Sequence, residues 1–181
     1  MTFDPELVTF VINRFFPAMA KKFHLETRSE PTLFTLLGIS AHIKDYRLSY
    51  MLNRQLELAF IKMDDLVVSS GQKGTPEAFS LYHTLDEDHF NTYYLLSNRG
   101  QESVLVPELK QTDFLLLIEG PFKKSQSEAL SEKIRSIPQV LACFEIRFST
   151  LKNIENLLTD LEIHFTNIIR EGKTKYPSIK K

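Results

Sequence analysis

Two acidic side chains, Glu108 and Asp113, lie five residues apart in the segment from Val106 to Phe114. Two carboxylates can divide acid and base work when their environments differ. They can also serve the fold, because Asp113 can accept backbone N–H groups at a turn. Glu108 would then form an ion pair with Arg47 or Lys110. The spacing alone favours this structural interpretation.

A second polar cluster consists of Lys44, Asp45, Tyr46 and Arg47. If Ser40 caps a helix, the free amide groups of that helix can hold a phosphate or a carboxylate, with Lys44 or Arg47 closing over it. The other interpretation is a solvated helix start, in which Asp45 complements the helix dipole and Tyr46 is half buried. The residue types favour the solvated helix start.

Other residues that can carry chemistry lack the spacing that chemistry needs. The five histidines form no i, i+4 pair on an expected helix, and Cys143 is the only cysteine, so a zinc site is not expected. The turn Asp86-Glu87-Asp88-His89 is more typical of a solvated turn than of a metal site. The sequence contains no glycine-rich phosphate loop and no Gly-x-Ser-x-Gly motif. We therefore expect no cofactor and favour a binding protein over an enzyme.

The composition limits the classes of partner. With 22 Lys and Arg against 23 Asp and Glu, the net charge of -1 gives no overall field that attracts nucleic acid or anionic lipid. Tyr93 and Tyr94 beside Arg99 lack the glycine-aromatic pattern of RNA-binding strands. No stretch approaches the roughly 18 consecutive apolar residues of a membrane-spanning helix. Cys143 lies in an apolar run, which predicts a buried thiol and fits a cytoplasmic location.

These polar clusters must be positioned by strands and helices, which the hydrophobic pattern predicts in order along the chain. The apolar runs have strand length, and the helical stripes begin after capping signals such as Ser125-Gln126-Ser127-Glu128. The expected elements are a helix at 4–16, a strand at 32–39, a helix at 40–56, a strand at 59–69, a loop at 71–74, a three-stranded meander at 79–85, 90–97 and 103–106, a central strand at 113–119, a helix after Ser125, a strand at 140–148 and a helix from Ser149 or Thr150 to about Gly172.

The order strand, helix, strand occurs twice, at about 33–69 and at about 113–148. We therefore expect an α+β fold, with a mostly antiparallel sheet and helices packed on one face. Its core would be ferredoxin-like, made of two strand-helix-strand halves with the meander inserted between them.

The expected domain organisation has four parts. Residues 1–18 form an N-terminal helical extension, 19–149 an α+β domain, 150–172 a C-terminal helix packed on that domain, and 173–181 a flexible basic tail. Three interpretations of the extension stay open: it packs on the domain, it contacts a partner, or it lies upstream of a true start at Met19. The first and third are favoured equally.

Two segments carry a resemblance to a known family. Residues 106–114 read Val-Pro-Glu-Leu-Lys-Gln-Thr-Asp-Phe, and residues 37–48 read Leu-Gly-Ile-Ser-Ala-His-Ile-Lys-Asp-Tyr-Arg-Leu. On these segments the chain resembles the IPExxxVDY family of uncharacterised bacterial proteins, over about residues 21–158. Val106, Thr112 and Phe114 depart from the family pattern. The resemblance implies no activity, substrate or cofactor, and it favours a start near Met19.

The combined prediction is a small cytoplasmic protein that acts by binding a protein partner or by self-association, with no nucleic acid and no membrane as a partner. Its binding residues are expected in a polar groove between the two family-like segments, joined by a Glu108–Arg47 bridge. The alternative is a regulatory domain that senses a small anionic ligand, and an unrecognised enzyme is the third. The expected binding residues are Ser40, Lys44, Asp45, Tyr46, Arg47, Glu108 and Asp113.

Overall fold

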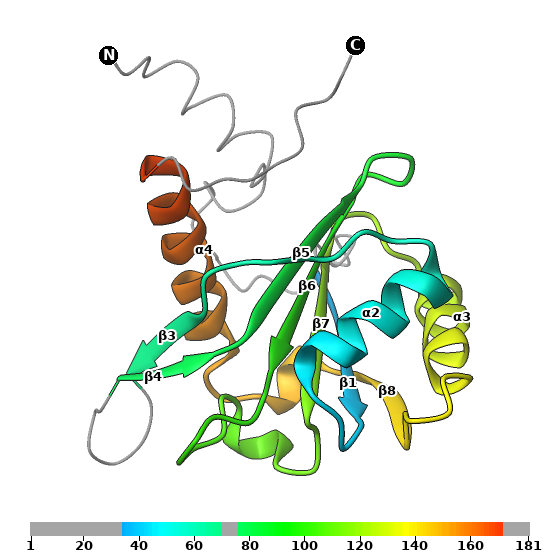
Figure 1. Cartoon of the computed structure of the whole chain (residues 1–181), viewed down its shortest axis with the longest axis horizontal. Coiled ribbons are helices and arrows are strands. Elements are labelled where there is room, and N and C mark those ends of the chain that lie inside the picture. The colour runs from blue at the N-terminus through cyan, green and yellow to red at the C-terminus, as the bar shows by residue number, and fades with distance from the viewer. Residues whose placement is uncertain (1–33, 70–75, 172–181) are drawn as a thin grey trace. The chain divides into compact units, whose positions relative to one another are not determined.

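The computed structural model describes residues 34–69 and 76–171 (Figure 1). The expected helix at 4–16, the loop at 71–74 and the basic tail lie outside these residues. The chain divides into two compact units, residues 27–154 and a second that joins 1–26 to 155–181. The described part of the second unit is residues 155–171, which include all of helix α4 (Ile154–Arg170) except its first residue. The expected packing of this helix on the α+β domain stays a prediction.

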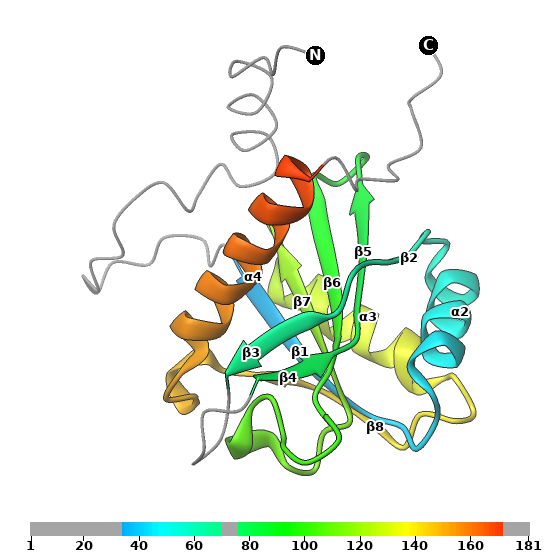
Figure 2. The same cartoon turned by 60° about the vertical axis from the view of Figure 1, so that its left-hand side comes forward.

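The larger unit is α+β, as predicted, with an antiparallel six-stranded sheet in the order β2-β5-β6-β7-β1-β8 and a separate antiparallel pair, β3-β4. Helices α2 and α3 lie on the same side of the large sheet (Figures 1 and 2). The elements are β1 Phe34–Ser40, α2 Asp45–Leu56, β2 Ile61–Lys62, β3 Leu66–Ser69, β4 Pro76–Phe79, β5 Leu81–Asp86, β6 Asn91–Ser97, the 3-10 turn η1 Pro107–Leu109, β7 Phe114–Glu119, α3 Lys124–Arg135, β8 Ala142–Ile146 and the 3-10 turn η2 Phe148–Thr150.

The centre of the sheet is strand β7, which lies between β6 and β1. All six of its residues are buried, which confirms the expectation that this apolar run needs cover on both faces. On the helical side, Leu116 and Ile118 pack with Leu48 and Leu52 of α2 and with Ile134 of α3. This core fixes the start of α2 against the ends of β1 and β7, where the candidate site lies.

Helix α2 begins at Asp45, so the predicted start at Ser40 is wrong. Ser40 is the last residue of β1, and its hydroxyl donates to the carbonyl of Gln111 at 2.8 Å. Lys44 occupies the N-cap position, and no side chain caps the helix there. The Ser40 hydroxyl holds the connection before β7 and is not available for capping.

Two strand predictions are also corrected. The strand expected at 59–69 is interrupted at Asp64 and Asp65, residues that strands disfavour, and its two halves pair with β5 and β4. The strand expected at 103–106 forms only a single bridge between Arg99 and Val104. The backbone of this segment bonds to Asn98 instead of to a neighbouring strand.

The elements near the C-terminal end have other bounds than expected. Helix α3 starts at Lys124, and the Gln126 side chain accepts a bond from the Lys123 N–H at 2.8 Å, so the box expected at Ser125 is shifted. Strand β8 covers five residues of the expected 140–148. Helix α4 does not start at Thr150, because that hydroxyl donates to the Arg147 carbonyl within η2.

Gly38 in β1 leaves no room for a side chain. A Cβ atom there would lie 2.8 Å from Cδ1 of Ile146 and 3.2 Å from the Thr112 side chain. We expect Gly38→Ala to lower the free energy of unfolding by about 1–2 kcal/mol through overpacking. Urea denaturation measures this loss. Ile146→Val removes the clashing methyl group, so it should destabilise the wild type but not the Gly38→Ala variant; equal losses in both backgrounds would contradict the clash.

The imidazole of His83 in β5 is 3% exposed, and burial lowers its pKa to about 4. Between pH 6.5 and 4 the unfolded chain therefore binds a proton that the folded chain does not, so stability falls as the pH falls. We expect this histidine to contribute about 2 kcal/mol of lost stability between pH 7 and pH 4.5. Denaturation of wild type and His83→Gln at both pH values measures the difference. Identical pH dependence in the two proteins would contradict it.

Candidate functional site

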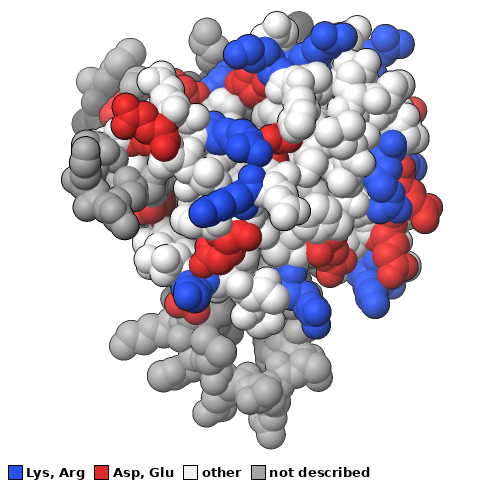
Figure 3. Space-filling view, turned by 90° about the horizontal axis from the view of Figure 1, so that it is seen from below, with Lys and Arg blue, Asp and Glu red and all other residues white. Residues whose placement is uncertain are grey.

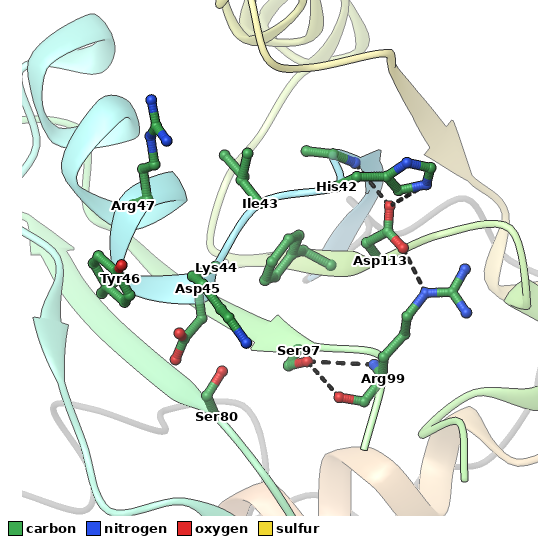
Figure 4. A pocket seen from close by; sticks show the side chains of 12 residues that line it. His42, Ile43, Lys44, Asp45, Tyr46, Arg47, Ser80, Ser97, Arg99 and Asp113 are labelled. Carbon is green, nitrogen blue, oxygen red and sulfur yellow. Dashed lines mark hydrogen bonds and ion pairs between the residues drawn. The ribbon is translucent and has the colours of Figure 1, made fainter. Parts of the chain in front are cut away.

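The ends of β1, β6 and β7 and the start of α2 surround a cavity of about 720 Å³ (Figure 4). The sequence brings these ends together because β1 and β6 both pair antiparallel with β7, so Ser40 and Ser97 lie beside the start of β7. The cavity is lined by Ala41, His42, Ile43, Lys44, Asp45, Tyr46, Arg47, Ser80, Ser97, Arg99, Asp113 and Phe114.

Asp113 is the most strongly held polar residue of the cavity. Its carboxylate accepts a hydrogen bond from the backbone N–H of Ala41 at 2.9 Å and another from Nε of Arg99. The Nε2 atom of His42 lies 3.8 Å from the same carboxylate. The Asp113 side chain is 8% exposed, whereas that of Arg99 is 51% exposed. The negative charge of Asp113 is thus balanced within the chain.

Asn98 holds the connection between β6 and β7 in place, immediately next to this cavity. Its side chain donates to the carbonyls of Leu109 and Thr112, each at 2.9 Å, and accepts from the N–H of Val106 at 2.9 Å. Asn98 is 0% exposed. Three backbone groups of the family-like segment 106–114 therefore depend on one side chain from the end of β6.

The structure brings together five of the seven residues predicted for the site. Lys44, Asp45, Tyr46, Arg47 and Asp113 line the cavity, while Ser40 and Glu108 do not. The carboxylate of Glu108 is exposed and accepts from the N–H of Lys152 at 3.3 Å. The predicted Glu108–Arg47 bridge is therefore wrong. Within segment 106–114, the acidic residue that forms an ion pair is Asp113, and its partner is Arg99. Glu108 lies in η1, which directs it toward Lys152 after β8.

The polar residues at the start of α2 point in different directions. Figure 4 shows the Lys44 side chain extending toward Ser97, whereas Arg47 points away from Asp113 and Arg99. Neither cationic side chain makes a hydrogen bond or an ion pair with another residue in the described ranges. Asp45 accepts from the Tyr82 hydroxyl at 3.2 Å, and burial together with this carboxylate raises the pKa of Tyr82. Tyr82 stays a donor.

This arrangement suits binding better than acid–base catalysis. The cavity has three permanent cations, Lys44, Arg47 and Arg99, against two carboxylates that already accept bonds from the chain. The surface seen in Figure 3 has acidic and basic side chains interspersed rather than one broad basic patch. In the part of the chain that the structure describes, no group of three or more His, Cys, Asp or Glu could hold a metal ion. None of the described helices has both the length and the apolar character needed to cross a membrane.

The polar cavity residues that the sequence did not predict are His42, Ser80, Ser97 and Arg99. In the sequence, Arg99 stands out only beside Tyr93 and Tyr94, where the pattern of an RNA-binding strand is missing. Its proximity to Asp113 follows from the β6–β7 register, in which Ser97 lies opposite Phe114. A correct pairing of these two strands would have placed Arg99 beside Asp113.

Comparisons with known proteins add no further assignment. No protein-family model matches the chain, and the search of curated proteins found no match. The resemblance to the IPExxxVDY family therefore stays a prediction, and the site is interpreted from its own geometry.

Proposed function

We propose that this protein is a binding module whose cavity holds an anionic group, a carboxylate or a phosphate, of its ligand. The observation that carries the proposal is which charged groups of the cavity already have a partner within the chain. Asp45 and Asp113 are occupied by donors from the chain, whereas Lys44 extends into the cavity without an ion-pair partner among the described residues.

An anion in this position would meet several donors at once. The Lys44 ammonium group, the hydroxyl of Ser80 and the guanidinium of Arg99 belong to residues that line the same space, whereas the Ser97 hydroxyl already donates to the Arg99 carbonyl at 2.7 Å. Hydrogen bonds to charged groups are about twice as strong as those between neutral groups, and partial exclusion of water strengthens them further. Asp113 fixes the position of Arg99 before a ligand arrives, which lowers the entropic cost of binding.

The anionic group has two candidate sources. The first is an acidic segment of a protein partner, either another protein or a second copy of this chain, and the open rim with exposed side chains of α2 supports this source. The second is a small free anion that regulates the protein. A cavity of about 720 Å³ supports this source, because it lies within the usual range of ligand pockets, about 300–1,000 Å³.

Lys44→Glu tests the proposal with little risk to the fold, because this side chain has no partner in the described residues. We expect the variant to bind succinate, inorganic phosphate or an acidic peptide at least about tenfold more weakly, since the hydrogen bond to a charged group is lost and a repulsive charge is added. Isothermal titration calorimetry measures the affinities. Lys133→Glu on α3 is the matched control and should bind like the wild type.

Each outcome of this titration is informative. Binding of the acidic peptide alone would identify a partner chain as the source, and binding of the free anions alone would identify a small ligand. Light scattering on the purified protein tests whether a second copy of this chain is the partner. If Lys44→Glu and Lys133→Glu change the affinity equally, or if none of the three probes binds the wild type, the cavity is not the anion site.

We also propose a ferredoxin-like core and membership of the IPExxxVDY family. The strand order β8-β1-β7-β6, with α2 after β1 and α3 after β7, supports the first proposal. The contacts of the Asp113 side chain with the Ala41 N–H and with Arg99 support the second, because they give this position of the segment a structural reason to carry an aspartate. A cytoplasmic location is supported by Cys143, a single free thiol whose pKa burial raises to about 11.

A further inference from the structure

The solvent-facing side of helix α2 carries two large aromatic side chains. Tyr46 is 66% exposed and Tyr50 is 60% exposed. Because they are four residues apart, they lie one above the other on one face of the helix. Exposed single aromatics are common, but two on one helix face beside a cavity are an uncommon use of side chains that contribute strongly to binding when they are covered.

Two arginines flank this aromatic pair. The guanidinium of Arg54 lies 6.0 Å from the centre of the Tyr50 ring. Arg47 lies at the edge of the cavity, with its side chain directed away from Asp113 and Arg99 (Figure 4). Neither arginine forms an ion pair with an acidic residue of the described ranges. They are seven positions apart, which corresponds to about 10 Å along the helix axis. The surface of Tyr46, Arg47, Tyr50 and Arg54 is called the α2 surface below.

We infer that the α2 surface docks an acidic segment of a protein partner, with one acidic group continuing into the cavity at Lys44. This inference rests on the proposed function and commits it to a protein source. Tyrosine and arginine are the residue types enriched at the energetic centres of protein interfaces. A partner with two carboxylates about 10 Å apart matches Arg47 and Arg54. In an extended chain, side chains on the same face are about 7 Å apart at i, i+2 and about 13 Å apart at i, i+4, which brackets that distance.

A nucleic acid is the other polymer that arginine and tyrosine can bind. The phosphate backbone needs a continuous basic surface, and nonspecific affinity comes from many such contacts. The net charge of -1 and the interspersed charges in Figure 3 favour a protein partner instead. An oligonucleotide is therefore included in the test as the competing type of ligand.

The test uses the full chain and fluorescence anisotropy with a labelled deca-glutamate peptide. We expect the wild type to bind this peptide, and the double variant Tyr50→Ser/Arg54→Glu to bind it at least about tenfold more weakly, because an aromatic contact and a charge pair are lost together. The matched controls are Phe90→Ser, which removes another exposed aromatic, and Lys133→Glu, which makes the same kind of charge change on α3. Both controls should keep the wild-type affinity.

The outcomes separate this inference from the proposed function. If the double variant binds the peptide like the wild type while Lys44→Glu weakens binding, the α2 surface is not the docking site and the cavity proposal stands. If the peptide does not bind but succinate or phosphate does, the docking inference is overturned and a small ligand is the source. A labelled deca-thymidine that binds more tightly than deca-glutamate would also overturn it.

Discussion

Replacing Asn98 with alanine is expected to lower the free energy of unfolding by about 3–4 kcal/mol, the largest single loss that the structure predicts. The side chain satisfies three backbone groups, of Val106, Leu109 and Thr112, in a place that water does not reach. Alanine leaves these groups without their partner, and each net loss is about 1 kcal/mol, with an additional cost for the cavity. Urea denaturation followed by circular dichroism measures the change.

The control for this prediction lies in the same connection. Gln111 is exposed, so Gln111→Ala should change stability by no more than about 0.5 kcal/mol. Asn98→Asp keeps the acceptor toward Val106 but removes both donors and buries a charge, so it should be at least as unstable as the alanine variant. If Asn98→Ala is no more destabilising than Gln111→Ala, the described role of Asn98 is wrong.

The second large effect is expected at Asp113. Asp113→Ala should cost about 3 kcal/mol, because the N–H of Ala41 loses a charged acceptor and Arg99 loses its partner. Asp113→Asn keeps the size of the side chain and one acceptor oxygen, and it should cost less. Thermal and chemical denaturation of both variants measures the order.

A double-mutant cycle with Arg99→Ala isolates the ion pair from the other contacts of Asp113. We expect a coupling energy of about 1–2 kcal/mol, since one partner is buried and the other is half exposed. Ser40→Ala is a useful comparison, because its hydroxyl bonds to the neighbouring Gln111 carbonyl without touching Asp113. Additive losses at Asp113 and Arg99 would show that the two side chains do not interact in solution.

The hydrophobic pattern was sufficient to predict much of the fold. Strands near β1, β6 and β7 follow from apolar runs of strand length, the strand near β5 follows from alternating residues, and α2 and α3 follow from stripes of large aliphatics. The predicted element boundaries were wrong where a polar side chain could bond to either of two nearby backbone groups. Ser40 and Thr150 both carry hydroxyls suited to capping, yet each bonds to a carbonyl outside the helix that it was expected to start.

The sequence predicted only part of the candidate site. Lys44 to Arg47 line the cavity as a local cluster, because they follow one another at the start of α2. Pairing across the sheet was harder to predict. Arg47 was assigned to Glu108 on charge alone, whereas the register of β6 with β7 brings Arg99 to Asp113. Strand order determines which distant charges meet, and charge patterns alone do not contain that order.

The central claim is that the cavity between β1, β6, β7 and α2 binds an anionic group through Lys44. The most direct measurement is a nuclear magnetic resonance titration of the ¹⁵N-labelled full chain with succinate, phosphate and the deca-glutamate peptide. The account predicts saturable shifts of the amide signals of His42 to Arg47, Ser97 and Arg99 with at least one of these ligands, and loss of those shifts in Lys44→Glu. Shifts confined to other residues, or equal shifts in Lys44→Glu and wild type, would contradict it.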